Sequence, residues 1–247
     1  EWVANSFGFA SSLPFSFVYD GKSSRDLIKT WDTTRTEKKL DDRRLQSTIT
    51  YADSRTGLEA RGEVIRYLDY PAVEWVIYFR NAGKSDTAIL EDVRALDTVL
   101  PCDKTGKLLV HYADGSDMKI TDFAPRETVL AAGESLRIHS EPTSSIYALP
   151  FFNVEAAEEG VIGGIGWSGW WYADFVREQE GGASIRAGMP GTRLLLHPGE
   201  EIRTPRILLM FWEGDRVDAH NKWRRLLLDH YSPKPGGRPV LIPFIGS

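Results

Sequence analysis

Four aromatic residues gather within six positions, and their side chains are the ones in this sequence best suited to contact a ligand. Trp167, Trp170, Trp171 and Tyr172 enclose only Ser168 and Gly169. In a β-hairpin such a run directs rings to both faces and into the turn, whereas a core accepts one face only. At least one indole is therefore expected at the surface, where a flat apolar ring with an N–H donor suits the C–H face and hydroxyls of a sugar. Packing in a core or a domain interface is an equally good interpretation for any single tryptophan.

The sequence around this run resembles two known motifs, one for dinucleotide binding and one for a catalytic serine. Residues 164–169 match the dinucleotide-binding pattern G-x-G-x-x-G. In a dinucleotide site this pattern is followed by a helix whose amino end holds the pyrophosphate. Here residues 170–177 look like another strand instead. Residues 166–170 read G-W-S-G-W, which lacks the final glycine of the G-x-S-x-G nucleophile turn. We therefore interpret Ser168 as a turn hydroxyl and expect no nucleotide site.

Neither histidines nor carboxylates mark a catalytic site by their spacing. His111, His139, His197, His220 and His230 are scattered and show no metal-ligand spacing. The sequence holds 35 Asp and Glu residues, and nothing in its order identifies the pair that glycoside hydrolysis needs about 5 to 10 Å apart. We predict no catalytic residue, no metal site and no cofactor in this chain.

Composition excludes several classes of protein. With 247 residues, 42% hydrophobic and 26% charged, the chain is neither collagen-like, coiled-coil nor disordered. The formal net charge is -5 with both signs mixed along the chain, so a nucleic-acid or anionic-membrane partner is not expected. No apolar run approaches the ~20 residues that cross a bilayer. Cys102 is the only cysteine, which excludes an internal disulfide, and composition assigns no cellular compartment.

Short strands divided by polar turns fill most of the chain, from Leu13 to about Ile207. The apolar run at residues 72–79 suits a strand packed between two sheets. Strands at this spacing without helices between them predict an antiparallel β-sandwich. The clearest predicted strands span residues 16–19, 45–51, 58–67, 73–80, 89–100 and 108–111, and the predicted turns lie at 53–57, 81–85, 103–106 and 113–116.

One helix is predicted, over residues 215–231, with Asp215 as its N-cap and Ser232-Pro233 at its end. Ala219, Trp223 and Leu227 share one face, which we expect to pack on the sandwich. Residues 234–239 then read as a stiff linker, and an apolar run at residues 240–245 has barely begun when the sequence stops. An unfinished apolar strand is an unfavourable chain end, so we expect these residues to be one domain of a longer protein.

Seven segments follow one another along the chain in a particular order. They read HYADGS at 111–116, GESL at 133–136, SIYALPFFN at 145–153, GVIGGIGWSGWW at 160–171, AG at 187–188, LHPGEEIRTP at 196–205 and HNKWRR at 220–225. This series resembles the N-terminal domain of glycoside hydrolase family 36, the α-galactosidases and their relatives.

The resemblance implies an antiparallel β-supersandwich of galactose-mutarotase-like topology over residues 1–232, including the connector helix 215–231. Residues 233–247 would be the linker and the start of a (β/α)8 catalytic barrel. The family's Asp nucleophile and Asp acid/base would then lie after Ser247, so no residue here is named catalytic. The chain would be a non-catalytic domain of a retaining α-galactosidase-type hydrolase that supports its barrel, helps to assemble oligomers and shapes a site for an α-galactoside or related oligosaccharide.

Two departures from the family pattern bear on the sugar. Trp170 stands where the family usually has Asn, and residues 242–247 replace its usual Asn and Trp. The substrate-binding candidates that the resemblance implies are Trp167 and Trp171, with Trp170 beside them. A carbohydrate-binding or purely structural β-sandwich is an alternative. An aldose-epimerase-like enzyme has less support, because that reaction needs a histidine and carboxylates converging on one sheet face.

Overall fold

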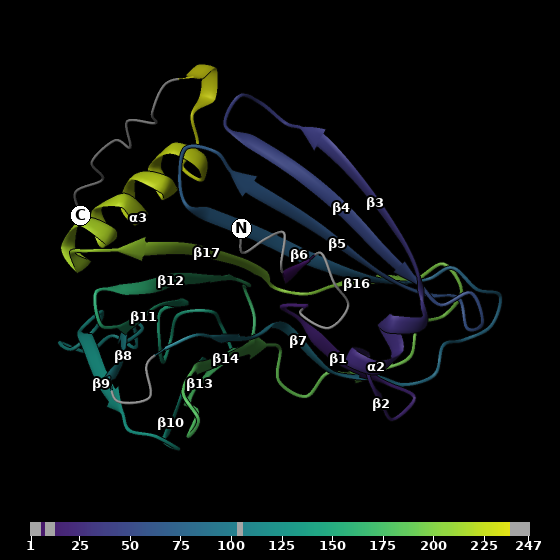
Figure 1. The fold of residues 1–247 in the computed structure, drawn as a ribbon, viewed down its shortest axis with the longest axis horizontal. Coiled ribbons are helices and arrows are strands. Elements are labelled where there is room, and N and C mark those ends of the chain that lie inside the picture. The colour runs from purple at the N-terminus through teal and green to yellow at the C-terminus, as the bar shows by residue number, and fades with distance from the viewer. Residues whose placement is uncertain (1–5, 8–12, 103–105, 238–247) are drawn as a thin grey trace.

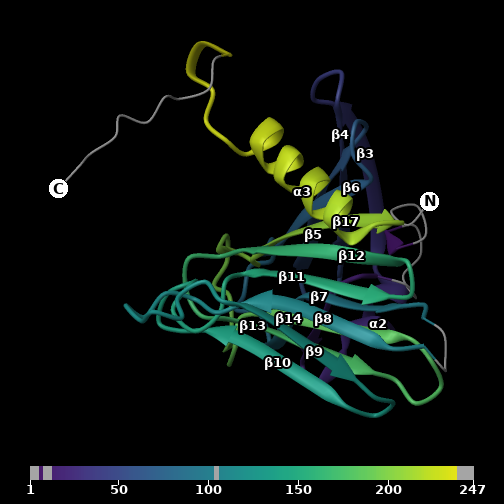
Figure 2. The same cartoon turned by 90° about the vertical axis from the view of Figure 1, so that its left-hand side faces the viewer.

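Two antiparallel β-sheets lie face to face in the computed structural model, which describes residues 6–7, 13–102 and 106–237. Figures 1 and 2 show the two layers, with one long helix on the outside of the larger sheet. The antiparallel sandwich with a C-terminal helix expected from the sequence is thereby confirmed.

The larger sheet has ten strands within the described residues. Its order is β3-β4-β5-β6-β17-β12-β11-β8-β9, and β16 pairs with β6 beside β17. The strands are β3 (Asp32–Lys39), β4 (Arg44–Ala52), β5 (Leu58–Tyr67), β6 (Ala72–Asn81), β8 (Leu108–Ala113), β9 (Pro125–Leu130), β11 (Phe151–Ala156), β12 (Glu159–Gly166), β16 (Glu201–Arg203) and β17 (Arg206–Glu213).

The smaller sheet has seven strands in the same described ranges. Its order is β10-β13-β14-β7-β1-β2, and β15 pairs with β7. The strands are β1 (Ser16–Tyr19), β2 (Lys22–Ser23), β7 (Leu90–Leu100), β10 (Ser135–Ser140), β13 (Trp171–Arg177), β14 (Ala183–Gly188) and β15 (Arg193–Leu194). The helical turns α2 (Ser24–Leu27) and η1 (Ile28–Thr30) follow β2.

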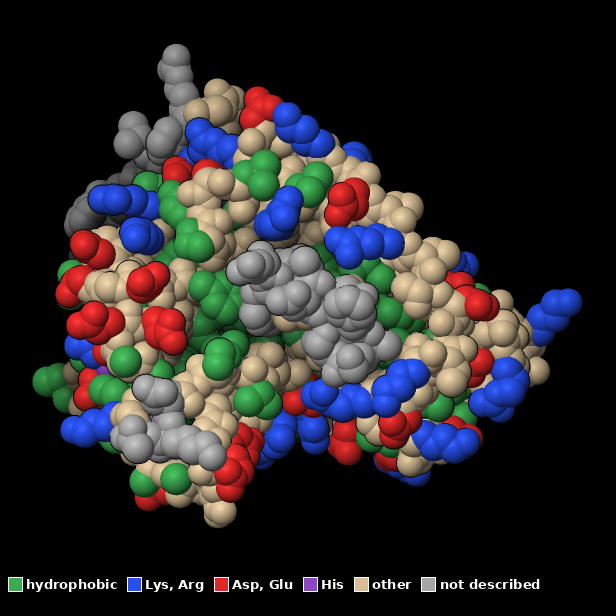
Figure 3. Space-filling view, in the orientation of Figure 1, with side chains coloured by type: hydrophobic (Ala, Val, Ile, Leu, Met, Phe, Trp, Pro, Cys, Tyr) green, Lys and Arg blue, Asp and Glu red, His purple; other side chains and the backbone are tan. Residues whose placement is uncertain are grey.

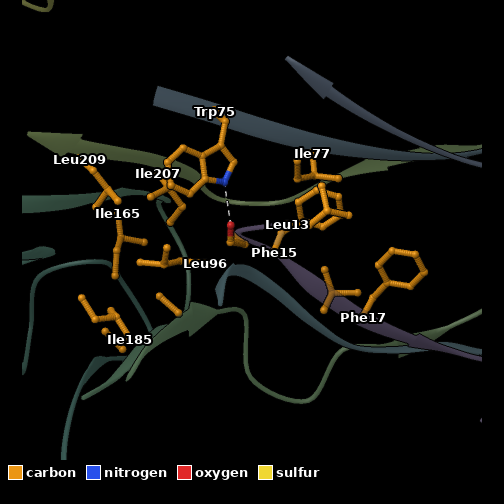
Figure 4. Packing of buried hydrophobic residues seen from close by; sticks show 14 of the residues in the cluster. Leu13, Phe15, Phe17, Trp75, Ile77, Leu96, Ile165, Ile185, Ile207 and Leu209 are labelled. Carbon is orange, nitrogen blue, oxygen red and sulfur yellow. Dashed lines mark hydrogen bonds between the residues drawn. The ribbon is translucent and has the colours of Figure 1, made fainter. Parts of the chain in front are cut away.

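The main core lies between the two sheets. Strands with alternating apolar residues, such as β5, bury every second side chain there, because successive side chains point to opposite faces. Trp75 of β6 is fully buried, and its indole Nε1 donates a hydrogen bond of 2.8 Å to the Ala95 carbonyl of β7, which joins the two layers (Figure 4). Burying a large apolar side chain of this kind contributes roughly 1.5 to 3 kcal/mol.

β6 is buried on both faces, and its outer cover differs from the one expected. Trp75, Ile77 and Phe79 face the smaller sheet, as the apolar run predicted. The opposite face, which includes Ala72, packs under a helix rather than under a second sheet. An uninterrupted apolar run predicts that both faces of a strand are buried, but it does not predict whether a sheet or a helix covers each face.

The helix α3 (Arg216–His230) is the one expected after Asp215, whose Oδ1 accepts a hydrogen bond of 3.0 Å from the Asp218 N–H. Ala219, Trp223 and Leu226 are buried against the outer face of the larger sheet, and Leu227 is partly buried. Figure 2 shows α3 lying over β17 and β12. A 3-10 turn, η2 (Pro235–Gly237), ends the described chain, so the last two residues of the linker and the apolar run at residues 240–245 lie outside the described residues.

Charges of both signs are mixed over the surface. On the face drawn in Figure 3, Lys and Arg side chains are interspersed with Asp and Glu. Among the residues that the structure describes, no helix is long and apolar enough to cross a membrane.

Candidate functional site

The tryptophan turn, residues 167–170, carries the chain from one sheet to the other. It leaves the end of β12 in the larger sheet and enters β13 in the smaller sheet. The Trp167 N–H donates a hydrogen bond of 3.1 Å to the Ile165 carbonyl, and a Cβ on Gly169 would lie 3.2 Å from Trp167 Nε1. The turn is therefore tight and lies where the two layers meet.

The three indoles have three different surroundings. Trp171 is 1% exposed in the main core, and its Nε1 donates a hydrogen bond of 2.9 Å to the Ser144 carbonyl. Trp170 is 52% exposed. Trp167 is half-buried, with the Arg203 guanidinium carbon 5.1 Å from its ring centroid, a cation–π contact. The expectation that at least one indole is exposed is confirmed by Trp170, whereas Trp171 has the core role.

The glycine-rich motif at residues 164–169 spans the end of β12 and part of the tryptophan turn. After one further residue, Trp170, the chain enters strand β13, as the sequence indicated. No helix begins there, so the backbone N–H groups that hold a pyrophosphate in a dinucleotide site are missing from this position. Ser168 is exposed in the turn, which fits the interpretation of its hydroxyl as part of a turn.

Histidines that are scattered in the sequence come together with carboxylates in space, which their spacing along the chain does not indicate. On the outer face of the larger sheet, His111 of β8 lies between two glutamates. Its Nε2 is 2.7 Å from Glu155 of β11, and its Nδ1 is 3.1 Å from Glu127 of β9. Arg216, at the start of α3, approaches the same glutamates at 3.3 and 3.4 Å. Both ring nitrogens are engaged, so this group anchors α3 and leaves no free base for a substrate.

His220 continues this anchor one turn along α3. Asn153 Nδ2 lies 3.2 Å from His220 Nε2, and Asn153 Oδ1 accepts a hydrogen bond of 2.9 Å from Trp212 Nε1. Burial, and then the nearby His111 and Arg216, lower the pKa of His220 below its ordinary value. The neutral imidazole is therefore the form that fits here.

A second polar cluster holds the other end of α3. Glu74 of β6 is 4% exposed and pairs with Arg206 at 2.8 Å. Its carboxylate also accepts hydrogen bonds from the Tyr67 hydroxyl, at 3.2 Å, and from the Tyr231 hydroxyl at the C-cap of α3. Burial, followed by the Glu74 charge, raises the pKa of Tyr231 far above its ordinary value, so this hydroxyl remains a donor.

A cavity of about 820 Å³ lies at the opposite end of β12 from the tryptophan turn. Its lining includes Leu100, Cys102, Phe211 and Lys222, with Glu159 at the first position of β12. Seven steps of about 3.3 Å place the two ends of β12, Glu159 and Gly166, about 23 Å apart, so the cavity is separate from the indoles of the tryptophan turn. Within the described ranges there is no group of three or more His, Cys, Asp and Glu residues placed to hold a metal ion.

Solved structures of α-galactosidases share the fold of this chain. The glycoside hydrolase family 36 α-galactosidase AgaA of Geobacillus stearothermophilus, solved with raffinose, has a TM-score of 0.69 and 17% identity, covering 90% of this chain and 33% of AgaA. An α-galactosidase of Lactobacillus brevis has a TM-score of 0.67 and 15% identity over 87% of this chain and 31% of its own. The galactosidase domain of AgaSK has a TM-score of 0.61 and 14% identity over 81% of this chain and 30% of that one.

These similarities are visible in the folds and not in overall sequence. No protein-family model matches the sequence, and no curated protein matches it either. The chain spans about a third of the length of the solved structures that it resembles. It therefore has the fold of about one third of a glycoside hydrolase family 36 α-galactosidase, in agreement with the resemblance indicated by its ordered sequence segments.

Proposed function

We propose that this chain is the non-catalytic N-terminal domain of a retaining α-galactosidase-type glycoside hydrolase. The observation that carries the proposal is the shared fold, over 90% of this chain, with an α-galactosidase that was solved with raffinose. In this role the catalytic carboxylates lie in a (β/α)8 barrel after Ser247. The sandwich supports that barrel and contributes to an oligomer interface, and its ligand is an α-galactoside or a related oligosaccharide.

The attachment of α3 fits a supporting role. The polar groups at its two ends, around Glu155 and Glu74, and the apolar contacts of Trp223 and Leu226 between them, fix the helix on the larger sheet. A helix that is held at both ends determines where the chain goes next. Residues 233–247 are then the linker and first strand of the barrel, positioned relative to the sandwich by α3.

The tryptophan turn is the part of this chain that we assign to the sugar site. Trp170 is exposed, and Trp167 presents one indole face to Arg203. Flat indole rings next to the catalytic barrel would stack on the apolar face of a sugar ring. Trp171 supports the turn from below, through its buried ring and its hydrogen bond to Ser144.

The first prediction compares this chain with the longer protein that contains it. Residues 1–247 alone are expected to release no p-nitrophenol from p-nitrophenyl α-galactoside, whereas the longer protein hydrolyses it. The reason is that a retaining glycosidase needs two carboxyl groups only about 5 Å apart across the sugar, and we place both in the barrel. Turnover by the purified 247-residue chain above a no-protein control would reject this assignment.

A carbohydrate-binding or purely structural sandwich is the alternative function. The exposed ring of Trp170 is compatible with it, and the sequence after Ser247 separates the two: barrel-strand motifs with two aspartates favour the hydrolase. An aldose-epimerase-like activity would need a free histidine beside carboxylates. The one histidine held between two glutamates, His111, has both ring nitrogens engaged, which argues against that activity.

A further inference from the structure

The outer face of the smaller sheet carries a row of alternating charges. The strand register places Arg137 of β10 opposite Asp174 of β13, Asp174 opposite Arg186 of β14, and Arg186 opposite Asp97 of β7. Residues next to these in sequence belong to the core between the sheets, among them Ile138, Ala173, Phe175, Ile185, Ala187 and Leu96. Because neighbouring side chains of a strand point to opposite faces, the charged row lies on the side away from the larger sheet.

The row itself has two positive and two negative charges, but Arg25 and Arg94 beside Asp97 add an excess of positive charge. Arg137 and Asp174 form a two-bond pair at 2.5 and 2.6 Å, which neutralises both. Asp97, by contrast, is shared by three guanidinium groups: Arg25 at 3.4 Å, and Arg94 and Arg186 at 3.5 Å each. The arginine cluster, defined as Arg25, Arg94 and Arg186, therefore has an excess of two positive charges over Asp97. Its side chains are 36% to 46% exposed, so a ligand can reach them.

The same face contains two buried polar atoms that make no hydrogen bond. In the part of the chain that the structure describes, two buried side-chain polar atoms have no hydrogen-bond partner, namely Arg186 Nε and Ser184 Oγ. Both belong to β14, two residues apart, and so to the face of the charged row. Arg186 Nε is the atom that lies 3.5 Å from Asp97 Oδ1, so Arg186 offers a ligand the rest of its side chain, which is 41% exposed.

Aromatic rings border the cluster. His139 of β10 pairs with Tyr172 of β13, and its ring lies 5.5 Å from that of Tyr147, which is 54% exposed. The Arg137 guanidinium stacks on the Tyr172 ring at 4.8 Å, and the Tyr172 hydroxyl hydrogen-bonds Arg94. Tyr172 thus connects the exposed rings to the cations.

The size of this surface suits a chain of sugars. His139 and Arg94 lie on β10 and β7, which are separated by β13 and β14. Three strand spacings of about 4.8 Å place them about 14 Å apart. A single sugar ring does not span that distance, whereas an oligosaccharide does.

We propose that the outer face of the smaller sheet binds an acidic oligosaccharide, with a uronic acid carboxylate on the arginine cluster and a neighbouring sugar ring against Tyr147. A neutral sugar would account for the exposed rings but not for the excess of positive charge. An acidic peptide would account for the arginines but not for rings beside them. The inference goes beyond the proposed function, because binding on this sheet requires no catalytic barrel.

Isothermal titration of residues 1–247 with trigalacturonate tests the proposal, with neutral galactotriose and hexaglutamate as comparison ligands. Trigalacturonate is expected to bind at least about tenfold more tightly than either. Arg186→Gln and Arg94→Gln are expected to weaken that binding about tenfold or more, since each removes a charge-assisted hydrogen bond. Arg25 is exposed on the short α2 turn, so Arg25→Gln should fold normally and lose affinity as well. Tyr147→Ala is expected to weaken binding several-fold.

Arg35→Gln is the matched control, because Arg35 is an equally exposed arginine on the other sheet, at the edge strand β3. It is expected to leave trigalacturonate binding unchanged. The proposal is overturned if trigalacturonate does not bind, if galactotriose or hexaglutamate binds equally well, or if Arg35→Gln weakens binding as much as Arg25→Gln. The hydrolase proposal is tested separately by galactoside turnover in the longer protein, so either can fail while the other holds.

Discussion

Trp170 and Trp171 are adjacent in sequence and differ in exposure, so their substitution should affect different properties. In the longer hydrolase that we propose, Trp171→Ala is expected to destabilise the fold by about 3 to 5 kcal/mol, because it removes a buried ring from the main core. Trp167→Ala and Trp170→Ala are expected to lower kcat/KM several-fold to some tens-fold, because a stacked ring contributes about 1 kcal/mol and each ~1.4 kcal/mol is tenfold.

Measuring the denaturation midpoint and kcat/KM on the same variants separates these effects. Normal kinetics from a well-folded Trp167→Ala, Trp170→Ala double variant would leave the domain as scaffold and interface only. Sequence alone indicated that one of the clustered indoles is exposed, since a core accepts one face. It did not indicate which one, because that depends on where the chain crosses between the sheets.

His220 has a protonation state that its partners determine. Trp212 Nε1 is a donor only, so it fixes Asn153 Oδ1 as acceptor and turns the Asn153 amide N–H groups toward His220. His220 Nε2 must then accept, which a protonated imidazole cannot do. This geometry agrees with the lowered pKa that burial produces.

The unfolding free energy should therefore depend on pH through His220. The pKa of His220 in the folded chain is below the ordinary value of 6.5. Between these two pKa values the unfolded chain binds more protons than the folded chain, so stability falls as pH drops below 6.5. His220→Gln, which keeps an acceptor, is expected to lose less stability between about pH 8 and about pH 5 than the wild type. Urea denaturation at the two pH values measures the difference.

His197→Gln is the control for this comparison. Asp86 raises the pKa of His197 through a hydrogen bond, so that pair stabilises the fold below pH 6.5 and loses its effect as pH rises through the raised pKa. Removing this pair by His197→Gln therefore cannot reduce the loss of stability at low pH. An identical pH dependence in His220→Gln and wild type would show that the imidazole is not held neutral.

At the scale of elements, α3 depends on the residues that face the larger sheet. Leu226→Ala is expected to lower the unfolding free energy by about 2 to 5 kcal/mol, because Leu226 is fully buried. Leu227, which the helical periodicity places on the packed face, is only partly buried, so Leu227→Ala should lower the unfolding free energy by less. Leu228→Ala, at a residue 54% exposed, is the control and is expected to change stability by less than about 0.5 kcal/mol. Equal effects of the Leu226 and Leu228 substitutions would contradict this packing.

Sequence patterns predicted some elements better than others. β1 and β5 have the predicted bounds, and α3 begins after its predicted cap, because each has apolar periodicity and a clear boundary signal. β3 was not among the predicted strands. All eight of its residues are polar and exposed, so the periodicity on which strand prediction depends is missing. Pairing with β4 along its whole length forms this strand.

At the scale of the whole molecule, one core cluster includes residues from both sheets, such as Trp75 of β6 and Phe175 of β13. We therefore expect residues 1–247 to unfold in a single cooperative transition, with coincident midpoints in far-ultraviolet circular dichroism and tryptophan fluorescence. Buried indoles in the main core and under α3 let fluorescence report on both regions. Two separated transitions would show that α3 or one sheet is an independent unit.

The polar groups that hold α3 could not be predicted from the sequence. His111 and Glu155 are 44 residues apart, and Arg216 is 61 residues beyond Glu155. Only the strand order, which places β8 next to β11 and both near the start of α3, brings them together. The fold class follows from local periodicity, whereas such clusters depend on topology, which a single sequence specifies only through the whole chain.

The exposed strand β3 has a consequence for how this protein behaves in concentrated solution. A sheet edge whose N–H and C=O groups are open can add a strand from another molecule and so begin an aggregate. Arg35, Glu37, Lys38 and Lys39 put charged side chains along this edge, and desolvating them would oppose such growth. The polarity that excluded β3 from strand prediction thus opposes growth of the ten-stranded sheet at its β3 edge.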